Sequence, residues 1–399
     1  MFRLVPPAGT GLTIGDLARI KVKWISRASS SPTFDNELRE LFGAKHVLPV
    51  DSGRAALYLI LKTIEKQRGD SRREVILPAY TCYSVAASVI RAGFMIRLVD
   101  VKPETMDYDF DSLAAQDVSN VAAIVVGSLF GIPNDWRRLQ EFAKQHHIDL
   151  IDDAAQALGE SSYGTACGLH GTVGFYSLGR GKNISTYSGG IIVTNDEAFA
   201  SDLKAAIDLL PKPGLIASIG SLYKMGFFSL LSRPGLFWLP AMLPFLGIGE
   251  TVYEESFSVG RLTNAQTSAI PVVMKKLANL RQTRIGNSMA MAKSIHGARG
   301  RFVPGFSGDS CPAYIRMPIL MPDETSRSAC IQSLRAKGIV ASTMYPTTIG
   351  KITQLPQGSI CNPGEFSGAE DIIRRLMTVP THPYVSKRDR EVIIESVLS

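Results

Sequence analysis

A lysine stands among glycines and serines in the stretch FYSLGRGKNISTYSGGIIVTND, residues 175–196. Such a lysine, Lys182, is most often a solvated charge on a surface turn between two strands. The chemical alternative is that its amine binds an aldehyde as a Schiff base, which requires a lowered pKa. Ser177 precedes the lysine by five residues, a spacing that can place its hydroxyl on a phosphate while the amine reaches the aldehyde. The neighbouring glycines allow the backbone to approach a planar ligand closely.

Paired aspartates end an apolar run in IDLIDDAAQALGE, residues 148–160. One carboxylate at a strand end can hold the protonated nitrogen of a pyridine ring and keep that ring an electron sink. Two alanines leave room for a flat ring, and Gln156 adds an amide nearby. Asp152 and Asp153 could instead bind a metal, divide acid and base roles, or cap a helix. Because no cluster of histidine, cysteine and glutamate accompanies them, the sequence predicts no metal site.

A helix start with an anion-binding pattern lies in VDSGRAALYLILKTIEKQ, residues 50–67. Ser52 is a favoured N-cap type, Gly53 allows close approach, and the amides at a helix N-terminus bind phosphate. Arg54 adds a charge with bidentate reach. Taken alone, this pattern also describes an ordinary capped helix.

A weaker pattern is ILPAYTCYSVAAS, residues 76–88. Here Cys82 and Tyr83 lead from a strand into a helix, a place where a side chain could stack on a ring or contact a phosphate. Alone, the pattern distinguishes little from an ordinary strand-to-helix turn.

Alternating strands and helices between about residues 45 and 195 must position these side chains. Runs such as MIRLVDV and VAAIVVGSLFG alternate with helical stretches such as DWRRLQEFAKQHH. This order predicts a mainly parallel sheet with helices on both faces, and such sheets bind ligands at the carboxyl ends of their strands. After about residue 255 long helical material and a smaller α+β portion follow. We therefore predict an N-terminal arm outside the main core (1–35), a large domain (36–250) and a small C-terminal domain (251–399).

The composition is that of an ordinary globular protein: 399 residues, 45% hydrophobic, 20% charged, net charge +7. Its 43 basic residues are spread along the chain without a basic run or a zinc-finger or helix-turn-helix pattern, so we expect no nucleic-acid partner. The five cysteines form no C-x-x-C pair, which favours a reducing compartment over a disulfide framework. The N-terminal stretch contains no apolar core of signal-peptide length, and the expected location is the cytoplasm.

One segment, residues 214–248, is strongly apolar: GLIASIGSLYKMGFFSLLSRPGLFWLPAMLPFLGI. Lys224, Arg233 and three prolines interrupt it, so no clean run reaches the roughly 20 residues that a membrane-spanning helix needs. We expect an insertion that is buried or covered by another subunit. Contact with a membrane surface is the main alternative, and a re-entrant or spanning element is a third.

The order of these stretches resembles the DegT/DnrJ/StrS family of pyridoxal-phosphate (PLP) sugar aminotransferases. The resemblance covers nearly all of the chain after residue 35, in six ordered blocks: FDNELRELFGAKHVLPVDSGRAALYLIL, EVILPAYTCYSVAASVIRAGFMIRLVDVKPETMDYD, LFGIPNDWRRLQEFAKQHHIDLIDDAAQALG, VGFYSLGRGKNISTYSGGIIVTND, GRLTNAQTSAI and LMTVPTHPYVSKRDREVI. It implies a fold-type-I PLP transferase, in which a large domain with a mainly parallel seven-stranded sheet joins a smaller C-terminal α+β domain.

The resemblance also implies roles for the residues above. Lys182 would bind the cofactor covalently and shuttle protons, Asp153 would pair with the pyridine nitrogen, and Gln156 would approach the phenolic oxygen of the ring. The phosphate would be held by Ser52, Gly53, Arg54 and Ser177. Family members are usually homodimers with sites at the subunit interface. Glutamate is their common amino donor, and a keto sugar carried on a nucleotide is their common acceptor, in polysaccharide or glycoconjugate biosynthesis.

Several positions depart from the family pattern. Cys82 replaces the aromatic residue often stacked on the ring, which leaves that role to Tyr83 or another group. Tyr187 and Ser188 replace a glycine and an acid before the Gly-Gly pair. Arg54 replaces a threonine, and Val259 replaces an asparagine that reaches the partner's phosphate. We expect Arg54 to compensate for Val259 from within the same subunit.

These departures leave the cofactor residues intact and predict an unusual acceptor. Dehydratase relatives of the family carry a histidine in place of the lysine, so Lys182 favours transamination over dehydration or acyl transfer. A PLP-binding, membrane-peripheral regulatory protein without turnover is the alternative from a different class.

Overall fold

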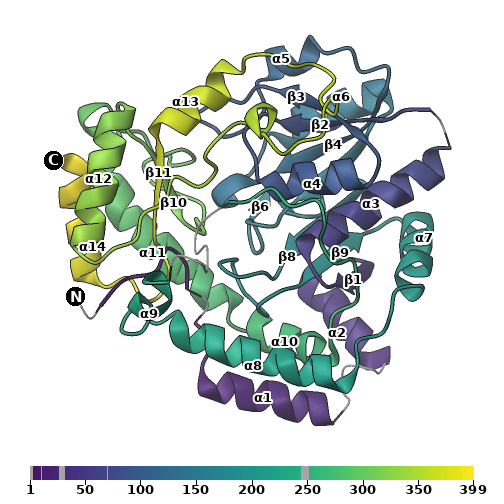
Figure 1. Ribbon diagram of the computed structural model, residues 1–399, viewed down its shortest axis with the longest axis horizontal. Helices are drawn as coiled ribbons and strands as arrows, with labels where there is room; N and C mark the ends of the chain where they lie inside the picture. Colours follow the sequence, from purple (N-terminus) through teal and green to yellow (C-terminus); the bar gives the residue numbers. More distant parts are fainter. Residues whose placement is uncertain (1–2, 10, 27–31, 70, 244–250) are drawn as a thin grey trace.

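The structure is a computed structural model that describes residues 3–9, 11–26, 32–69, 71–243 and 251–399. Its centre is a seven-stranded sheet with the strand order β1-β9-β8-β5-β4-β2-β3 (Figure 1). The strands are β1 His46–Val50, β2 Glu74–Pro78, β3 Met95–Val99, β4 Val121–Gly127, β5 Asp149–Asp153, β8 Val173–Ser177 and β9 Gly190–Thr194. Pairing is antiparallel for β1–β9 and β8–β9 and parallel for the other four pairs. The predicted α/β fold with a mainly parallel seven-stranded sheet is confirmed.

Helices cover both faces of this sheet, as the sequence predicts. The helices of this half are α2 Pro32–Phe42, α3 Gly53–Arg68, α4 Tyr83–Arg91, α5 Phe110–Ala114, α6 Trp136–His146 and α7 Glu197–Asp208, and a short β6–β7 pair spans Ser161–Ser162 and Thr165–Ala166. One core cluster joins Val75 and Val125 to α3 and α4. Another joins Ile76 and Ile124 to Trp136 of α6. Neighbouring strand residues thus point to opposite faces.

The carboxyl ends of β4, β5 and β8 lie together at one edge of the sheet. Gly127 is in register with Asp153, and Asp153 is in register with Phe175. Helix α3 begins at the same edge, because a Cβ atom added to Gly53 would lie only 3.2 Å from the Cβ atom of Ser177. The sheet therefore delivers the ends of three strands and one helix to a common place.

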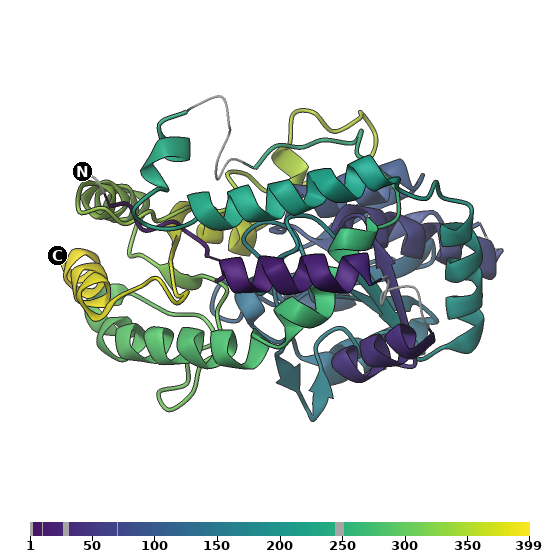
Figure 2. The ribbon, with the colours of Figure 1, turned by 90° about the horizontal axis from the view of Figure 1, so that it is seen from below.

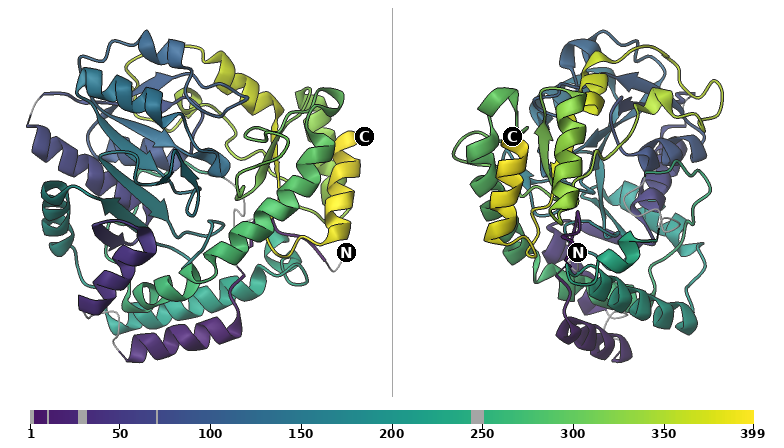
Figure 3. Two further views of the ribbon diagram at one scale, coloured as in Figure 1. Left: turned by 180° about the vertical axis from the view of Figure 1, so that it is seen from behind. Right: turned by 60° about the vertical axis from the view of Figure 1, so that its left-hand side comes forward.

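The C-terminal part contains long helices and a two-stranded sheet. Its elements are α10 Asn264–Met274, α11 Leu277–Ile295, β10 Met317–Leu320, α12 Glu324–Ala336, α13 Ser367–Arg375, β11 Leu376–Val379 and α14 Lys387–Leu398, with β10 antiparallel to β11. Figure 3 shows α11, α12 and α14 packed beside one another at one end of the molecule. The domain boundary predicted at 250/251 touches residues 244–250, outside the described ranges, and stays a prediction.

The predicted N-terminal arm is integrated into the fold rather than lying outside the core. Val5 is fully buried in the largest core cluster and forms a β-bridge with Ile339. Arg3 donates two hydrogen bonds to the carboxylate of Asp389, at 2.8 and 2.7 Å. Helix α1 Ile14–Ile25 packs against α10 and against α8 Leu215–Leu231, and Figure 2 shows α1 and α8 side by side. The expectation of an arm outside the main core is corrected, because pairing with residues more than 300 positions away holds it.

The apolar insertion forms α8 Leu215–Leu231 and α9 Trp238–Ala241, and its residues 244–248 lie outside the described ranges. Helix α8 buries Ser218, Met225 and Ser229. Its exposed side chains, 40–87% accessible, are Leu215, Ile216, Ile219, Tyr223, Phe227 and Leu230. The expectation of an insertion buried within the subunit is therefore wrong. In the described part of the chain, no helix has the length and apolar character needed to cross a bilayer.

Candidate active site

A cavity of about 570 Å³ lies at the carboxyl ends of β4, β5 and β8. The structure brings eight of the nine predicted site residues to its walls: Ser52, Gly53, Arg54, Cys82, Asp153, Gln156, Ser177 and Lys182. These residues come from four segments that span 130 positions of the chain. Their convergence follows from the sheet, since the carboxyl ends of parallel strands meet at one edge.

Lys182 lies in the turn between β8 and β9, after Gly181, whose φ is +75°. Its side chain is partly buried and lines this cavity and a second one of about 530 Å³. Burial lowers the pKa of the Lys182 amine, although the nearby Cys82 and Asp153 oppose this shift. A lowered pKa increases the neutral, nucleophilic fraction of the amine at neutral pH. The structure excludes a solvated surface turn for this lysine.

Asp153 presents a carboxylate to the same cavity. One of its oxygens, Oδ1, accepts a hydrogen bond of 3.0 Å from the Ala155 N–H. Burial raises the pKa of Asp153 to about 6, although that hydrogen bond and the nearby Lys182 amine oppose the shift. A cation beside the carboxylate would restore its ionised form. The protonated nitrogen of a pyridine ring is such a cation.

Asp152, the other member of the pair, points away from the cavity. Its Oδ2 accepts hydrogen bonds from the N–H groups of Gly168 and His170, at 2.6 and 3.2 Å, and lies 3.3 Å from His170 Nδ1. Asp152 is fully buried and anchors this loop. Among the described residues, no group of three or more histidine, cysteine, aspartate or glutamate side chains could hold a metal. The metal-binding alternative for the two aspartates has no support in this part of the chain.

The start of α3 forms a cradle for an anion. The Ser52 Oγ caps the helix by accepting a hydrogen bond of 3.1 Å from the Ala55 N–H. A Cβ atom on Gly190 would lie 2.3 Å from the Ser52 carbonyl oxygen, so only glycine permits this approach of β9. The hydroxyl of Ser177 stands opposite Gly53. A helix N-terminus with its amides and an adjacent hydroxyl suits a phosphate group.

These features together test whether the residues fit PLP. The cavity offers a phosphate cradle, a partly buried amine for the aldehyde and a partly buried carboxylate for the ring nitrogen. The phosphate, the aldehyde and the ring nitrogen of PLP therefore each have a complementary partner in the cavity.

Arg54 lies in the first turn of α3, beside the anion cradle, but its guanidinium already pairs with a carboxylate. Its guanidinium donates a hydrogen bond of 3.0 Å to the Glu254 carboxylate and lies 5.2 Å from the centre of the Phe257 ring. Val259 packs against the main core cluster. We predicted that Arg54 supplies the phosphate contact that Val259 cannot make, and this stays a prediction. It requires the Arg54 guanidinium to contact a phosphate while Glu254 lies beside it.

Tyr83 is the predicted residue that the structure does not bring to the cavity. Its ring is buried, and its hydroxyl lies 2.5 Å from the Thr347 Oγ1 and accepts a hydrogen bond of 3.0 Å from the Thr347 N–H. Tyr83 is the first residue of α4, and this start directs the side chain toward the C-terminal part. Cys82, one residue earlier, lines both cavities. Tyr83 therefore does not line either cavity, and stacking on a cofactor ring by another group stays a prediction.

Sequence reasoning missed two residues from the C-terminal part, Tyr345 and Arg316, which line the second cavity together with Lys182. The Tyr345 hydroxyl accepts a hydrogen bond of 3.1 Å from Gln156 Nε2, while Gln156 Oε1 accepts another from the Phe130 N–H. Burial lowers the pKa of Arg316. Its guanidinium contacts the Met344 sulfur at 3.3 Å, and no described carboxylate pairs with it. An unpaired guanidinium beside a reactive amine suits a carboxylate or phosphate ligand.

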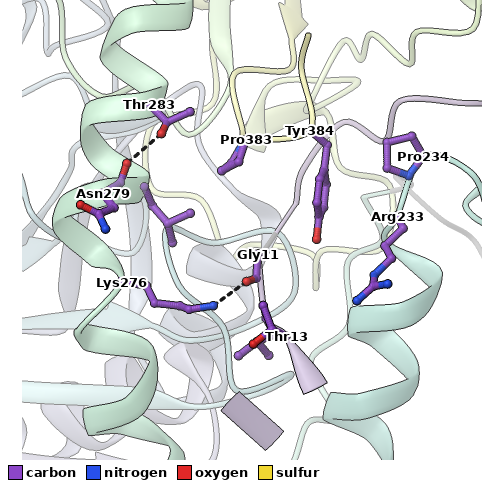
Figure 4. Close-up of a pocket in the computed structure, with 11 residues that line it drawn as sticks. Gly11, Thr13, Arg233, Pro234, Lys276, Asn279, Thr283, Pro383 and Tyr384 are labelled. Carbon is purple, nitrogen blue, oxygen red and sulfur yellow. Dashed lines mark hydrogen bonds between the residues drawn. The ribbon is translucent and has the colours of Figure 1, made fainter. Parts of the chain in front are cut away.

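A further cavity of about 570 Å³ lies between the N-terminal segment and α11 and contains none of the predicted site residues (Figure 4). Arg233 and Lys276 stand on its walls. The Lys276 amine donates a hydrogen bond of 2.7 Å to the Gly11 carbonyl and also pairs with the Asp16 carboxylate. Its charge thus anchors the N-terminal segment to α10 and α11.

Comparisons with known proteins agree with this geometry. A model of the DegT/DnrJ/EryC1/StrS aminotransferase family matches residues 17–398. Protein MosB of Rhizobium meliloti is 28% identical over 250 residues, which cover 62% of this chain and 44% of MosB. GDP-perosamine synthase of Caulobacter vibrioides is 34% identical over 182 residues, which cover 46% of this chain and 47% of that enzyme. The chain thus spans less than half the length of these curated relatives.

Among solved structures, the sugar aminotransferase CalS13 of Micromonospora echinospora superposes with a TM-score of 0.78 at 21% identity. The match covers 99% of each chain. This similarity shows that the two proteins share their fold.

Proposed function

The chain belongs to the DegT/DnrJ/EryC1/StrS aminotransferase family, and from this membership we propose that it is a PLP-dependent aminotransferase that moves an amino group from glutamate to the ketone of a keto sugar. The observation that carries this proposal is the convergence of Lys182, Asp153 and the start of α3 on one cavity. Sugar-acting relatives such as GDP-perosamine synthase support the acceptor class. A role in polysaccharide or glycoconjugate synthesis agrees with this chemistry.

Each residue has a task that its surroundings support. Bound PLP supplies an electrophilic aldehyde and an electron-withdrawing ring that stabilises negative charge on a neighbouring carbon. The Lys182 amine, with its lowered pKa, would hold PLP through the aldehyde and would carry the proton between the two reacting carbons. Asp153 would keep the ring nitrogen protonated, and the start of α3 with Ser177 would anchor the phosphate. Gln156 is held by Phe130 and Tyr345, which fixes its amide at the cavity wall.

Lys182 also bears on the competing reaction. Relatives of this chain include a GDP-4-keto-6-deoxy-D-mannose 3-dehydratase from Yersinia pseudotuberculosis. The family resemblance implies a histidine at this position in dehydratases, and this chain carries Lys182 there instead. Lys182 therefore favours transamination over dehydration.

The proposal is tested by the two halves of the reaction. The purified full-length protein is expected to be yellow, to lose its visible absorbance when glutamate is added, and to recover it with a keto-sugar acceptor. Colour without a response to glutamate would instead support a PLP-binding protein without turnover. Absence of colour after incubation with PLP would refute the cofactor assignment.

Arg316 is proposed to bind a carboxylate of glutamate. Arg316→Gln is expected to raise the glutamate concentration needed for half-bleaching about 10- to 100-fold, the range for losing a charged hydrogen bond. Arg335→Gln, an exposed position near the end of α12, is the matched control and should leave this concentration unchanged. An unchanged half-bleaching concentration in Arg316→Gln would contradict the assignment.

We further propose a reducing compartment, which the five cysteines support because all are free thiols. We also propose a homodimer with its sites near the subunit interface. Val252 supports the dimer, because it lines the first cavity while 69% of it is exposed. Light scattering should give twice the 43.3-kDa mass of one chain.

We also propose that α1 and α8 lie peripherally on a membrane surface. The apolar side chains Ile14, Val22 and Ile25 of α1 are 65–77% exposed beside the exposed residues of α8. Residues 209–243 contain lysine and arginine but no aspartate or glutamate. An apolar face with basic residues suits anionic lipid. A second copy on this face would bring two basic segments without acidic partners together, because a two-fold interface pairs a patch with itself.

The full-length protein is expected to float with vesicles that contain phosphatidylglycerol and far less with pure phosphatidylcholine vesicles. The double substitution Ile216→Glu and Tyr223→Glu should reduce the floating fraction at least about fivefold, since it places two carboxylates in the apolar face. Leu209→Glu, at an equally exposed position, should have little effect. If the double variant lowers the mass in light scattering and leaves flotation unchanged, the face is a subunit interface and the membrane proposal fails.

A further inference from the structure

The second cavity, of about 530 Å³, is lined by two chemically different groups of residues. One group is cationic: Lys182, Arg180, Arg316 and, from α8, Lys224. The other group is apolar and comes from α8, α9 and the turn between them: Phe227, Phe228, Leu231, Phe237 and Pro240. None of the described residues that line this cavity is acidic. The cavity therefore suits a ligand with an anionic part near Lys182 and an apolar part against α8.

Tyr187 lies beside residues of both the cationic and the apolar group. It stands where the family pattern has a glycine, and its own backbone is left-handed with φ of +73°, a costly conformation for a bulky residue. Its ring lies 5.9 Å from the Phe228 ring at 81°. The guanidinium of Arg180 and the amine of Lys224 lie 5.4 and 6.0 Å from its centre. The departure at position 187 and the apolar insertion thus form one wall.

This wall offers few hydrogen bonds to the edge of a nucleotide base. The polar side chains that α8 and its C-cap contribute are Lys224 and Ser232. The Ser232 hydroxyl donates its hydrogen bond, of 2.6 Å, to the Phe228 carbonyl. The phenyl and aliphatic groups that remain complement a hydrocarbon chain.

Phe227 marks a path out of the cavity. It lines the cavity and is 65% exposed, and the exposed apolar residues of α8 continue from it along the outside of the helix. A hydrocarbon chain that leaves the cavity over Phe227 therefore meets the surface that we assign to the membrane.

We propose that the acceptor is lipid-linked: a keto sugar joined through phosphate or diphosphate to a long hydrocarbon chain. The ketone lies at Lys182, the phosphate groups lie between Arg180 and Lys224, and the hydrocarbon lies along α8. This inference rests on the proposed amino transfer, and it replaces the nucleotide carrier that the family resemblance implies.

Calorimetric binding to the full-length protein tests the carrier with three probes: farnesyl diphosphate below its critical micelle concentration, inorganic diphosphate and UDP. We expect farnesyl diphosphate to bind at least tenfold more tightly than inorganic diphosphate, because its hydrocarbon chain leaves water. UDP should bind no better than inorganic diphosphate. Equal binding of the two diphosphates, or tighter binding of UDP than of farnesyl diphosphate, would overturn the inference.

Substitutions locate the hydrocarbon. Phe227→Ser should weaken farnesyl diphosphate binding at least fivefold and leave inorganic diphosphate binding unchanged, whereas Phe227→Leu should bind nearly as well as the wild type. Leu209→Ser, 88% exposed after α7, is the control. Equal farnesyl diphosphate affinity in all three variants would place the chain elsewhere and refute the path over Phe227. Bleaching of the wild type by glutamate, measured separately, shows whether the proposed function stands when the carrier assignment fails.

Discussion

Lys182→Ala is expected to abolish glutamate-driven amino transfer, with a loss of at least about 10³-fold in rate. The alanine variant has neither the amine that attaches the aldehyde nor the base that moves the proton between the reacting carbons. Lys182→Arg should be equally inactive, since it keeps the positive charge but presents no nucleophilic amine at neutral pH. Stopped-flow absorbance with glutamate measures the first half of the reaction, and a coupled assay for 2-oxoglutarate measures turnover.

Two comparisons make the Lys182 result specific. Lys275→Ala changes an exposed lysine after α10 and should retain the wild-type rate. The Lys182→Ala protein should bind PLP without the visible band of a lysine adduct, and sodium borohydride should fix PLP to the wild type alone. An alanine variant with an unchanged visible spectrum or borohydride labelling would remove Lys182 as the attachment site.

Asp153→Asn is expected to stabilise the cofactor-free protein while it inactivates the enzyme. Folding raises the pKa of Asp153 from 3.8 to about 6. The folded protein therefore binds this proton more tightly than the unfolded chain does, and proton binding stabilises the fold. This stabilisation is complete below pH 3.8 and is lost as the pH rises through about 6. At pH 8 the wild type therefore bears the cost of a partly buried charge, and asparagine removes that cost. We expect the variant's free energy of unfolding to exceed that of the wild type by about 2 kcal/mol at pH 8.

This difference should shrink as the pH falls from 8 toward 5, because the wild-type carboxyl becomes protonated. Urea unfolding of the cofactor-free proteins at several pH values measures it, and Asp309→Asn, at an exposed position, should show no such trend. The rate of the PLP-loaded variant should fall about 10²- to 10³-fold, because an amide does not hold the ring nitrogen protonated. A variant less stable than the wild type at pH 8 would refute the cost assigned to Asp153.

The Asp153 carboxyl also makes the binding of PLP depend on pH. Below about pH 6 the cofactor-free Asp153 is protonated, and PLP binding must then displace a proton. Stability and function therefore oppose each other at this position, as they often do where a charge is held in a site for chemistry.

The sequence by itself determined the parts of the site that depend on short-range order. Ser52 and Gly53 start a helix, and Asp153 and Ser177 end strands, so each is marked by its own neighbours. Because the strands are parallel, their carboxyl ends meet at one edge, and the eight residues of the cavity could be predicted to converge. Lys182 follows Ser177 within a short turn and is carried to the same edge.

Only the tertiary structure decided which neighbouring side chain faces the site. Asp152 and Asp153 are adjacent in one strand, and the alternation of side chains sends the first into the loop around His170 and the second into the cavity. Cys82 and Tyr83 are separated in the same way at the start of α4. Types and spacing do not tell such neighbours apart, because the choice of face depends on what packs against each one.

Tertiary contacts also bring residues to the second cavity that no local sequence pattern identifies. Arg316 and Tyr345 reach the cavity from more than 130 positions beyond Lys182, through packing of the C-terminal part against the sheet. Helix α8 is apolar on nearly all sides, so its sequence does not specify which side is covered. Its neighbours α1 and α10 bury one narrow side of it and leave the rest for an external partner.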